Sequence, residues 1–223
     1  MSQSIDVQLA GQSFQLLADR GLYWADEQTL FVADTHFGKE ATFRRHGVPV
    51  PMGSTDATLD AIRRMIHETK ASSLIILGDM FHARSSLSPD VVESLTTFFE
   101  ALPAMTFTLI RGNHDALLGQ LPAAWPLEVV EPVMRMNRVA LGHHPIPLPD
   151  KADLYLCGHL HPALKLGSQR HAIGKLPCFW LSGRCLVLPA IGNFTGTHAV
   201  KLNPSDQAWV VADNEIYFHN PNA

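Results

Sequence analysis

Cysteine is scarce in this chain. Its three cysteines, Cys157, Cys178 and Cys185, are irregularly spaced and form no CxxC pair. That pattern excludes a disulfide framework and a zinc finger, and it is typical of a protein kept in a reducing compartment. The first residues carry neither a basic nor an apolar segment, so we expect no signal peptide, and no apolar run approaches the length of a membrane span. We therefore expect a cytoplasmic protein with no membrane partner.

Charged residues are also few, at 17% of the chain, and the formal net charge is −4. A negative excess excludes a surface coated with basic residues for bulk nucleic-acid binding, although it leaves room for a local basic patch. Hydrophobic residues make up 46% of the 223 residues, which is enough to bury a full core. The polar motifs described next are spread from Asp34 to His161 and must converge, so we expect a single domain over residues 1–223.

The sequence repeats one design, a short apolar run that stops at residues able to bind a metal. In the clearest case the run 74–77 ends at Gly78 and Asp79. Such a run predicts a buried parallel strand, and open α/β sheets bind their ligands at the carboxyl ends of such strands. Four further runs end in the same way, namely 30–33, 107–110, 139–141 and 154–156. The polar residues that follow the five runs are Asp34, His36, Asp79, Asn113, His114, Asp115, His143, His144, His159 and His161.

These residue types are ligands of divalent metals. Carboxylate, amide and neutral imidazole groups suit Mn, Fe, Zn and similar cations, and a carboxylate can bridge two of them. Asp79 follows the central run and is the natural bridge. Two cations about 3.5–4 Å apart hold a phosphoryl group and make a nucleophile of water at neutral pH. One such motif occurs often by chance, but five in succession, each behind a predicted strand, are strong evidence for a metal site.

Hydrophobic spacing and turn residues predict strands at both ends of the chain and helices between strands in the middle. A helix over about 54–70 would be capped by Ser54 or Thr55, and another would begin at Ser88. We expect a loop over residues 40–53, because two prolines lie close together there. The alternation predicts two sheets packed face to face with helices outside. Short strands are expected at 5–9, 13–17, 21–24, 179–181, 185–188, 199–202, 208–211 and 216–219.

The five polar loops resemble the motifs of the calcineurin-like metallophosphoesterases, and the resemblance spans about residues 30–162. It implies an α/β fold, a four-layer αββα sandwich of two mixed β-sheets flanked by helices, and a two-metal phosphoesterase activity. A narrower resemblance, to the ligase-associated DNA damage response endonuclease PdeM subfamily, rests on residues 33–39, 43–45, 47 and 77–82. It implies a nuclease that acts on DNA in bacterial DNA repair, in functional association with a DNA ligase and a helicase.

The superfamily motifs imply a role for each polar residue. One metal would be held by Asp34, His36, Asp79 and His161. The other would be held by Asp79, Asn113, His143 and His159. Mn²⁺ is the expected cation at both sites, with Fe, Zn, Ni and Co as alternatives that the same ligands accept. The catalytic residues would be His114, as general acid near the leaving oxygen, and Asp115, which would orient it.

The doubled histidine at 143 and 144 leaves the ligand of the fourth motif ambiguous. We choose His143, because it is the first residue past the run 139–142 and Pro145 follows its neighbour. His144 would then support the ligand or contact the substrate. For His82 and Asp115, a structural or solvent-exposed role and a contact near the site are equally open.

Lys39, Arg44 and Arg45 follow the first metal loop, where they suit phosphate binding, although a simply solvated role is as open. They and the narrower resemblance favour DNA over the first alternative, a small nucleotide or phosphomonoester substrate. The second alternative is a non-catalytic interaction scaffold, which predicts eroded ligands, whereas every ligand position here is filled. The sequence therefore predicts a metal-dependent phosphoric ester hydrolase, a phosphodiesterase or endonuclease.

Overall fold

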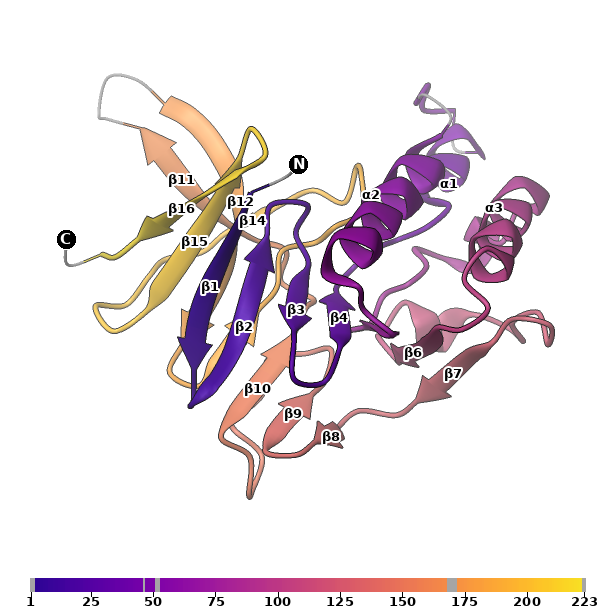
Figure 1. Ribbon diagram of the computed structural model, residues 1–223. Helices are drawn as coiled ribbons and strands as arrows, with labels where there is room; N and C mark the ends of the chain where they lie inside the picture. The colour runs from indigo at the N-terminus through magenta and orange to yellow at the C-terminus, as the bar shows by residue number, and fades with distance from the viewer. Residues whose placement is uncertain (1–2, 46, 51–52, 168–171, 222–223) are drawn as a thin grey trace.

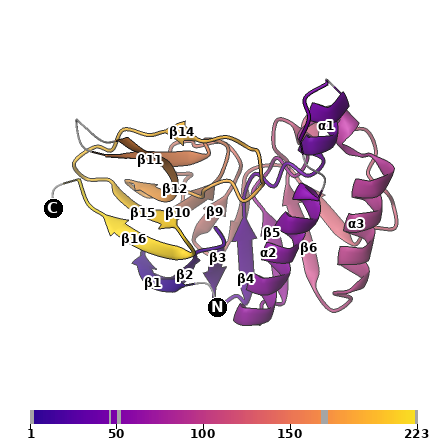
Figure 2. The same cartoon turned by 90° about the horizontal axis from the view of Figure 1, so that it is seen from above.

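The computed structural model describes residues 3–45, 47–50, 53–167 and 172–221. Its two β-sheets pack face to face, and a layer of helices covers the outer face of the first sheet (Figure 1, Figure 2). The core between the sheets contains Phe31 and Ile75 of the first sheet with Leu156 and Phe179 of the second. The predicted pair of mixed sheets is thus confirmed.

The first sheet contains seven strands in the order β1-β2-β3-β4-β5-β6-β7. They are β1 (Ser4–Leu9), β2 (Gln12–Leu17), β3 (Leu22–Trp24), β4 (Thr29–Val32), β5 (Ser73–Ile76), β6 (Thr106–Ile110) and β7 (Leu127–Val130). The first four strands run antiparallel as the predicted meander, whereas β4, β5, β6 and β7 are parallel. β4 and β5 are short apolar runs buried along almost their whole length, as expected of central parallel strands.

The second sheet contains nine strands, with the path β14-β11-β12-β13-β10-β9-β8 and the hairpin β15–β16 paired to β12. They are β8 (Met134–Met136), β9 (Val139–Leu141), β10 (Leu154–Cys157), β11 (Pro162–Gly167), β12 (Ala172–Ser182), β13 (Cys185–Val187), β14 (His198–Ala199), β15 (Gln207–Ala212) and β16 (Glu215–His219). β9, β10 and β13 are parallel neighbours, so their carboxyl ends share one edge. β11 lies between antiparallel β12 and parallel β14.

Three strands, β7, β8 and β11, were not expected from the sequence. β7 and β8 are edge strands of the two sheets, and their side chains are exposed or half-buried. A charged residue, Glu128 or Arg135, interrupts the apolar residues of each, so neither shows the longer apolar run of a buried strand. Pro126 and Pro132 flank β7 without interrupting it, and Pro162 is the first residue of β11, where a strand tolerates proline. The prolines in this region therefore mark strand ends.

The described α-helices are α1 (Lys39–Arg45), α2 (Ser54–Thr69) and α3 (Pro89–Glu100), with short 3₁₀ turns η1 (Arg84–Ser86) and η2 (Asp115–Leu117). The expectation of a loop over residues 40–53 is wrong at its beginning, where α1 forms. Proline breaks a helix only where its missing N–H and its ring meet helical hydrogen bonds. Pro49 lies beyond the end of α1, so it does not prevent this helix.

α2 also begins differently from the prediction. Gly53 occupies the N-cap with φ 90°, and neither Ser54 nor Thr55 caps the helix. The Thr55 hydroxyl instead accepts the N–H of Gly38 at 3.0 Å and donates to the Glu40 carboxylate at 2.9 Å. Glu40 also accepts the N–H of Thr55 at 3.2 Å, which satisfies one free donor of the α2 N-terminus. This buried network ties the start of α1 to the start of α2.

The helices pack on the first sheet through the apolar faces that their sequences predict. Leu59, Ile62 and Met65 of α2 meet Leu30 and Leu74 of the sheet in one buried cluster. Within the described residues, the buried clusters on the outer face of the second sheet contain residues of strands and loops alone. The helical layer is therefore confined to one side of the sandwich there. In the same part of the chain, no helix has both the length and the apolar character needed to cross a membrane.

Candidate metal centre

The five polar loops meet at one edge of the sandwich, although they come from two sheets. Asp34, Asp79 and Asn113 follow the neighbouring parallel strands β4, β5 and β6 of the first sheet. His143 and His159 follow β9 and β10 of the second sheet. The two sets touch, since the N–H of His159 donates to Oδ2 of Asp34 at 2.8 Å. The site thus lies where the carboxyl ends of two groups of parallel strands meet.

Asp34, His36 and His161 form the first cluster. Oδ1 of Asp34 lies 3.4 Å from Nε2 of His161, and Nε2 of His36 lies 3.3 Å from the same nitrogen. Asp34 is fully buried, and among the described residues its Oδ1 has no hydrogen-bond partner. A buried carboxylate oxygen without a partner is costly, and a cation would satisfy it.

The second cluster centres on Nε2 of His143. This nitrogen lies 3.1 Å from Oδ1 of Asn113, 3.2 Å from Nδ1 of His159 and 3.4 Å from Oδ2 of Asp79. Nδ1 of His143 lies 2.9 Å from the carbonyl oxygen of Leu77, which can only accept, so Nδ1 carries the proton. The lone pair of Nε2 is therefore directed into the cluster, as in a histidine that binds a metal.

Asp79 links the two clusters. Its Oδ2 lies 3.4 Å from Nε2 of His143 and 3.9 Å from Nε2 of His36. Its Oδ1 accepts the N–H of His114 at 2.9 Å, which fixes the orientation of the carboxylate. Oδ2 is thus the atom that faces both clusters.

The spacing of these atoms fits divalent cations. Donor atoms that share a cation with bonds of about 2.1 Å lie roughly 3–3.4 Å apart in tetrahedral or octahedral geometry. The separations of 3.1–3.4 Å within each cluster match this range. The donors are carboxylate, amide and imidazole groups, which suit Mn, Fe and Zn. Three-residue groups able to hold an ion recur here, among them Asp34 with His36 and His161, and Asp34 with Asp79 and His143.

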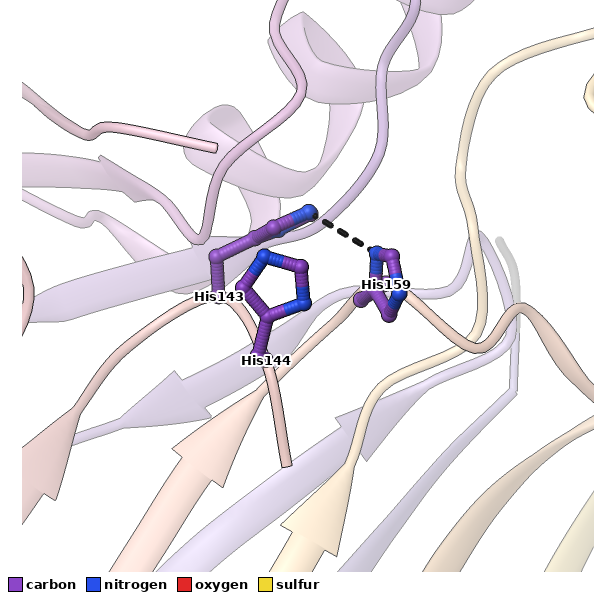
Figure 3. A group of neighbouring side chains, drawn as sticks. All are labelled: His143, His144 and His159. Carbon is purple, nitrogen blue, oxygen red and sulfur yellow. Dashed lines mark hydrogen bonds between the residues drawn. The ribbon is translucent and has the colours of Figure 1, made fainter. Parts of the chain in front are cut away.

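The structure separates the two neighbouring histidines. His143 is fully buried, whereas His144 is exposed. Figure 3 shows the rings of His143 and His159 joined by a hydrogen bond, with His144 beside them. The ring centroid of His144 lies 4.1 Å from that of His159, so His144 stays close to the second cluster. The burial of His143 fits the ligand role expected of it. His143, His144 and His159 also form a group whose donor atoms lie close enough to hold an ion, so His144 lies within reach of a cation as well as of a substrate.

The backbone is strained at most of the predicted ligands. Asp34, His36, Asp79, His159 and His161 all have positive φ, between 43° and 71°. Residues with a Cβ occupy this region rarely, and each such residue costs on the order of 1–3 kcal/mol. Strain of this kind persists where the surrounding fold imposes it, and it is concentrated at functional sites.

Two glycines let the loops approach one another. A Cβ on Gly78, whose φ is +83°, would lie 2.2 Å from Nδ1 of His143. A Cβ on Gly112 would lie 2.3 Å from Oδ1 of Asp79. Only glycine therefore allows these strand ends to bring their neighbours into contact.

Burial and nearby charges set the protonation of the site. Burial lowers the pKa of His36 to about 2, against the attraction of Asp79. Burial alone would raise the pKa of Asp79, but the hydrogen bond and charge of His143 hold it at about 2. Burial also opposes charge on His143, yet its contacts with Asp79 and Asp34 raise its pKa. His36 and Asp79 are thus in their metal-binding forms at neutral pH, and a cation would compete with a proton for Nε2 of His143.

His114 lies at the open side of the clusters, with its Nε2 3.9 Å from Oδ2 of Asp79. Its Nδ1 lies 2.6 Å from the carbonyl oxygen of His82, so the ring donates to that oxygen and presents Nε2 to the site. We expected Asp115 to orient this ring. The Asp115 carboxylate instead accepts the N–H groups of Gly112 at 2.9 Å and Phe81 at 3.2 Å. Asp115 therefore braces the loop that carries His114, and His82 supplies the direct contact.

Of the three predicted substrate-binding cations, the structure brings Lys39 to the metal centre. Its Nζ donates to the carbonyl oxygen of Thr195 at 3.4 Å, and burial lowers its pKa while Asp79 opposes the shift. Arg44 lies 3.9 Å from Asp90 at the start of α3, and Arg45 is exposed at the end of α1. The structure therefore separates the three cations.

One wall of the site was not predicted. A cavity of about 430 Å³ beside the clusters is lined by His159, Leu160, His161 and residues 195–198. Thr195 and Thr197 accept the ammonium groups of Lys39 and Lys175 through their backbone carbonyls, and such contacts leave no signature in a sequence. The role of His82 could not be predicted for a similar reason, since its backbone carbonyl oxygen makes the contact to His114. Its ring also stacks on His114 with centroids 5.1 Å apart.

Comparison with known proteins identifies the family. The family model for calcineurin-like phosphoesterases matches residues 28–163, which is more than half of the chain. The chain belongs to this family. Calcineurin-like phosphoesterases use divalent metals, so the chain is a metal-dependent phosphoric ester hydrolase, and the Asp and His clusters described above suit such cations.

Two solved structures illustrate the similarity. The crystal structure of Pseudomonas putida nuclease MPE is 29% identical, with a TM-score of 0.81 over 97% of this chain and 100% of that chain. Yfce, a phosphoesterase from E. coli, is 20% identical, with a TM-score of 0.40 over 83% of this chain and 88% of that chain. No curated protein sequence matches the chain significantly.

Proposed function

We propose that this calcineurin-like phosphoesterase hydrolyses the phosphodiester bonds of DNA with the help of two divalent cations. The position of Asp79 Oδ2 carries the proposal, because this one oxygen faces His143 at 3.4 Å and His36 at 3.9 Å. An ionised carboxylate in that position can be shared by two cations. The alternative of a non-catalytic scaffold gains no support from a site whose donors are all present.

The proposed ligand sets follow the two clusters. One cation would be held by Asp34, His36, Asp79 and His161. The other would be held by Asp79, Asn113, His143 and His159. When bound, the cations supply Lewis-acid activation of the phosphoryl oxygens and of water. Mn²⁺ is the first cation to test, followed by Fe, Zn, Ni and Co.

His114 is the proposed proton donor to the leaving oxygen. The bond from its Nδ1 to the carbonyl oxygen of His82 fixes the ring and leaves Nε2 facing the site. As an imidazolium, His114 can hold a proton at Nε2 and release it as the phosphorus–oxygen bond breaks. Asp115 acts on this step indirectly, since it holds the loop through the N–H of Gly112.

Two observations favour DNA over a small nucleotide or a phosphomonoester. Lys39 places an ammonium group beside the metal clusters, where it can bind a phosphate oxygen. The similar structure with the highest TM-score reported above is a nuclease. His144, exposed beside the second cluster, is a further proposed contact for substrate.

The repair context belongs to this proposal through the sequence resemblance alone. So does the functional association with a DNA ligase and a helicase. A binding assay between the purified chain and each of those enzymes tests the association, and no binding to either would remove it.

Activity on a matched substrate panel tests the proposed function. Protein stripped of metal is supplied with each cation in turn and assayed on single-stranded DNA, duplex DNA, bis(p-nitrophenyl) phosphate and a nitrophenyl phosphomonoester. We expect cleavage of DNA and of the diester, with little activity on the monoester. Activity on the monoester or on a small nucleotide, with none on DNA, would replace the proposal by the small-substrate alternative.

A further inference from the structure

A row of lysines crosses the second sheet beside the metal centre. Lys165 of β11 and Lys175 of β12 are direct partners in the antiparallel ladder, so their side chains leave the same face of the sheet. β14 pairs with β11 in parallel, and the pairing continues past the end of β14, where the N–H of Val200 donates to the carbonyl oxygen of Ala163 at 2.9 Å. Lys201 and Lys165 accordingly line one cavity of about 420 Å³.

This arrangement is unfavourable for the free protein. Like charges placed directly opposite one another destabilise a sheet. Lys165, Lys175 and Lys201 are all exposed. Anions bound between the ammonium groups would attract each of them and so offset their mutual repulsion.

The sequence around the row is free of acidic residues. Residues 154–205 contain five lysines and arginines and no aspartate or glutamate, although the whole chain has 21 acidic and 17 basic residues. The negative net charge of the chain thus conceals a basic segment that begins beside the metal clusters. Such asymmetry favours a polyanionic partner at this surface.

Contacts connect the row to the site. Nζ of Lys175 donates to the carbonyl oxygen of Thr197 at 2.9 Å. Thr197 lines the 430 Å³ cavity together with His159 and His161. Two residues earlier, the carbonyl oxygen of Thr195 accepts from Lys39. The segment 195–197 therefore contacts both Lys39 of the metal centre and Lys175 of the row.

We propose that Lys165, Lys175 and Lys201 bind the backbone phosphates of a DNA strand whose scissile phosphate lies at the metal centre. This inference rests on the proposed function. Lysine binds phosphate as a point charge and reads no base, so the row would increase affinity without sequence preference. Its contribution would also depend on length, because only a strand that extends beyond the 430 Å³ cavity reaches the lysines.

The test compares two triple variants with the same change in charge. The row variant carries Lys165→Gln, Lys175→Gln and Lys201→Gln. The control variant carries Lys70→Gln, Arg135→Gln and Lys151→Gln, three exposed cations outside the basic segment. For each protein, KM and kcat are measured on DNA strands of increasing length over a range of salt concentrations, and on bis(p-nitrophenyl) phosphate.

We expect the row variant to raise KM for long strands by about tenfold or more at low salt. The slope of log KM against log salt should fall by about 2, since each lost phosphate contact on a single strand removes about 0.7. Short strands and the small diester should be cleaved as by wild type. The control variant should show a much smaller change.

The outcomes separate this inference from the proposed function. A wild-type protein that hydrolyses the diester but neither binds nor cuts DNA removes the proposed DNA substrate and the lysine row with it. A wild-type protein that cuts DNA, with a row variant of unchanged KM and salt slope, overturns the row alone. An equal loss in the control variant also overturns it. Should the triple row variant melt early, the three single variants apply the same test, each lowering the slope by about 0.7.

Discussion

Oδ2 of Asp79 lies 3.4 Å from Nε2 of His143, so a carboxylate of the first sheet meets an imidazole of the second. In each side chain, a backbone contact holds the polar atom that does not face the partner. The N–H of His114 binds Oδ1 of Asp79, and the carbonyl oxygen of Leu77 binds Nδ1 of His143. When the His143 ring is neutral, the two atoms left facing one another have free lone pairs, which is the arrangement that a shared cation requires. Four of the five predictions below concern this centre.

Asp79→Asn is expected to lose most of both cations, because a neutral amide is a poor bridge between two of them. Asn113→Ala should mainly weaken the second site, where its Oδ1 lies 3.1 Å from Nε2 of His143. Metal analysis of the two purified variants checks the prediction. Full occupancy by two cations in Asp79→Asn would show that the carboxylate does not bridge.

His143→Ala and His144→Ala should differ sharply. The buried His143 contributes the atom around which the second cluster is built, so its removal should cost about one cation per chain. Removal of the exposed His144 should leave the metal content unchanged. It should raise KM for DNA, because His144 is a proposed contact for the substrate. Metal content and KM are measured on the same preparations. A loss of metal confined to His144→Ala would reverse the assignment.

His114→Ala should keep both cations and lose activity selectively. General acid catalysis contributes about 10²–10⁴-fold, and it matters for the sugar alkoxide of a DNA chain far more than for nitrophenolate. We therefore expect a heavy loss on DNA and a small one on bis(p-nitrophenyl) phosphate. The readouts are both rates and the metal content. Equal losses on the two substrates with metal intact would assign the proton to another group.

Lys39→Ala should raise KM for DNA by about tenfold or more, because a hydrogen bond to a charged group contributes about 1.5–3 kcal/mol. Arg45→Ala is the matched control, since Arg45 is a cation exposed at the other end of the same helix. It should change KM little. A larger effect from Arg45 than from Lys39 would mean that the substrate runs along the outer side of α1.

Thr55→Val should lower the free energy of unfolding by about 1–3 kcal/mol, because it leaves the buried Glu40 carboxylate and the Gly38 N–H without the hydroxyl that serves both. Thr58→Val in the same helix is the control. Its hydroxyl donates to the carbonyl oxygen of Ser54, which is one bond where the Thr55 hydroxyl makes two, so its loss should cost less. Urea unfolding of both variants measures the difference, and equal costs would argue against the network.

Much of the centre could be predicted because its donors are side chains placed directly after apolar runs. The run before Asp79 becomes β5, and the run before His143 becomes β9, as their patterns indicate. Which strands pair with one another could not be predicted from the sequence. Hydrophobic runs reveal that a strand is buried but not which strand it adjoins, so the division of the loops between two sheets emerged only from the structure.

Other features could not be predicted because they leave only a weak signal in the sequence, or because tertiary contacts outweigh the local preference of a residue. α1 forms although two prolines follow closely, since a proline ring clashes with the carbonyl four residues earlier, and for Pro49 that residue is Arg45, the last of the helix. Thr55 looks like a helix cap in sequence, yet tertiary contacts with Gly38 and Glu40 take its hydroxyl. The contact of His114 with the carbonyl oxygen of His82 is a backbone interaction that any residue at position 82 could make.

The division of the proposed ligands between two sheets has a consequence for the lifetime of the protein. Asp34 and His161 are separated by most of the matched family region, so a cation held by both joins distant parts of the chain much as a disulfide would. A ligand that binds only the folded chain stabilises it by about 4 kcal/mol at a thousand times its Kd. Cells short of metal would therefore hold less of this protein, through faster unfolding and degradation, as well as a less active one.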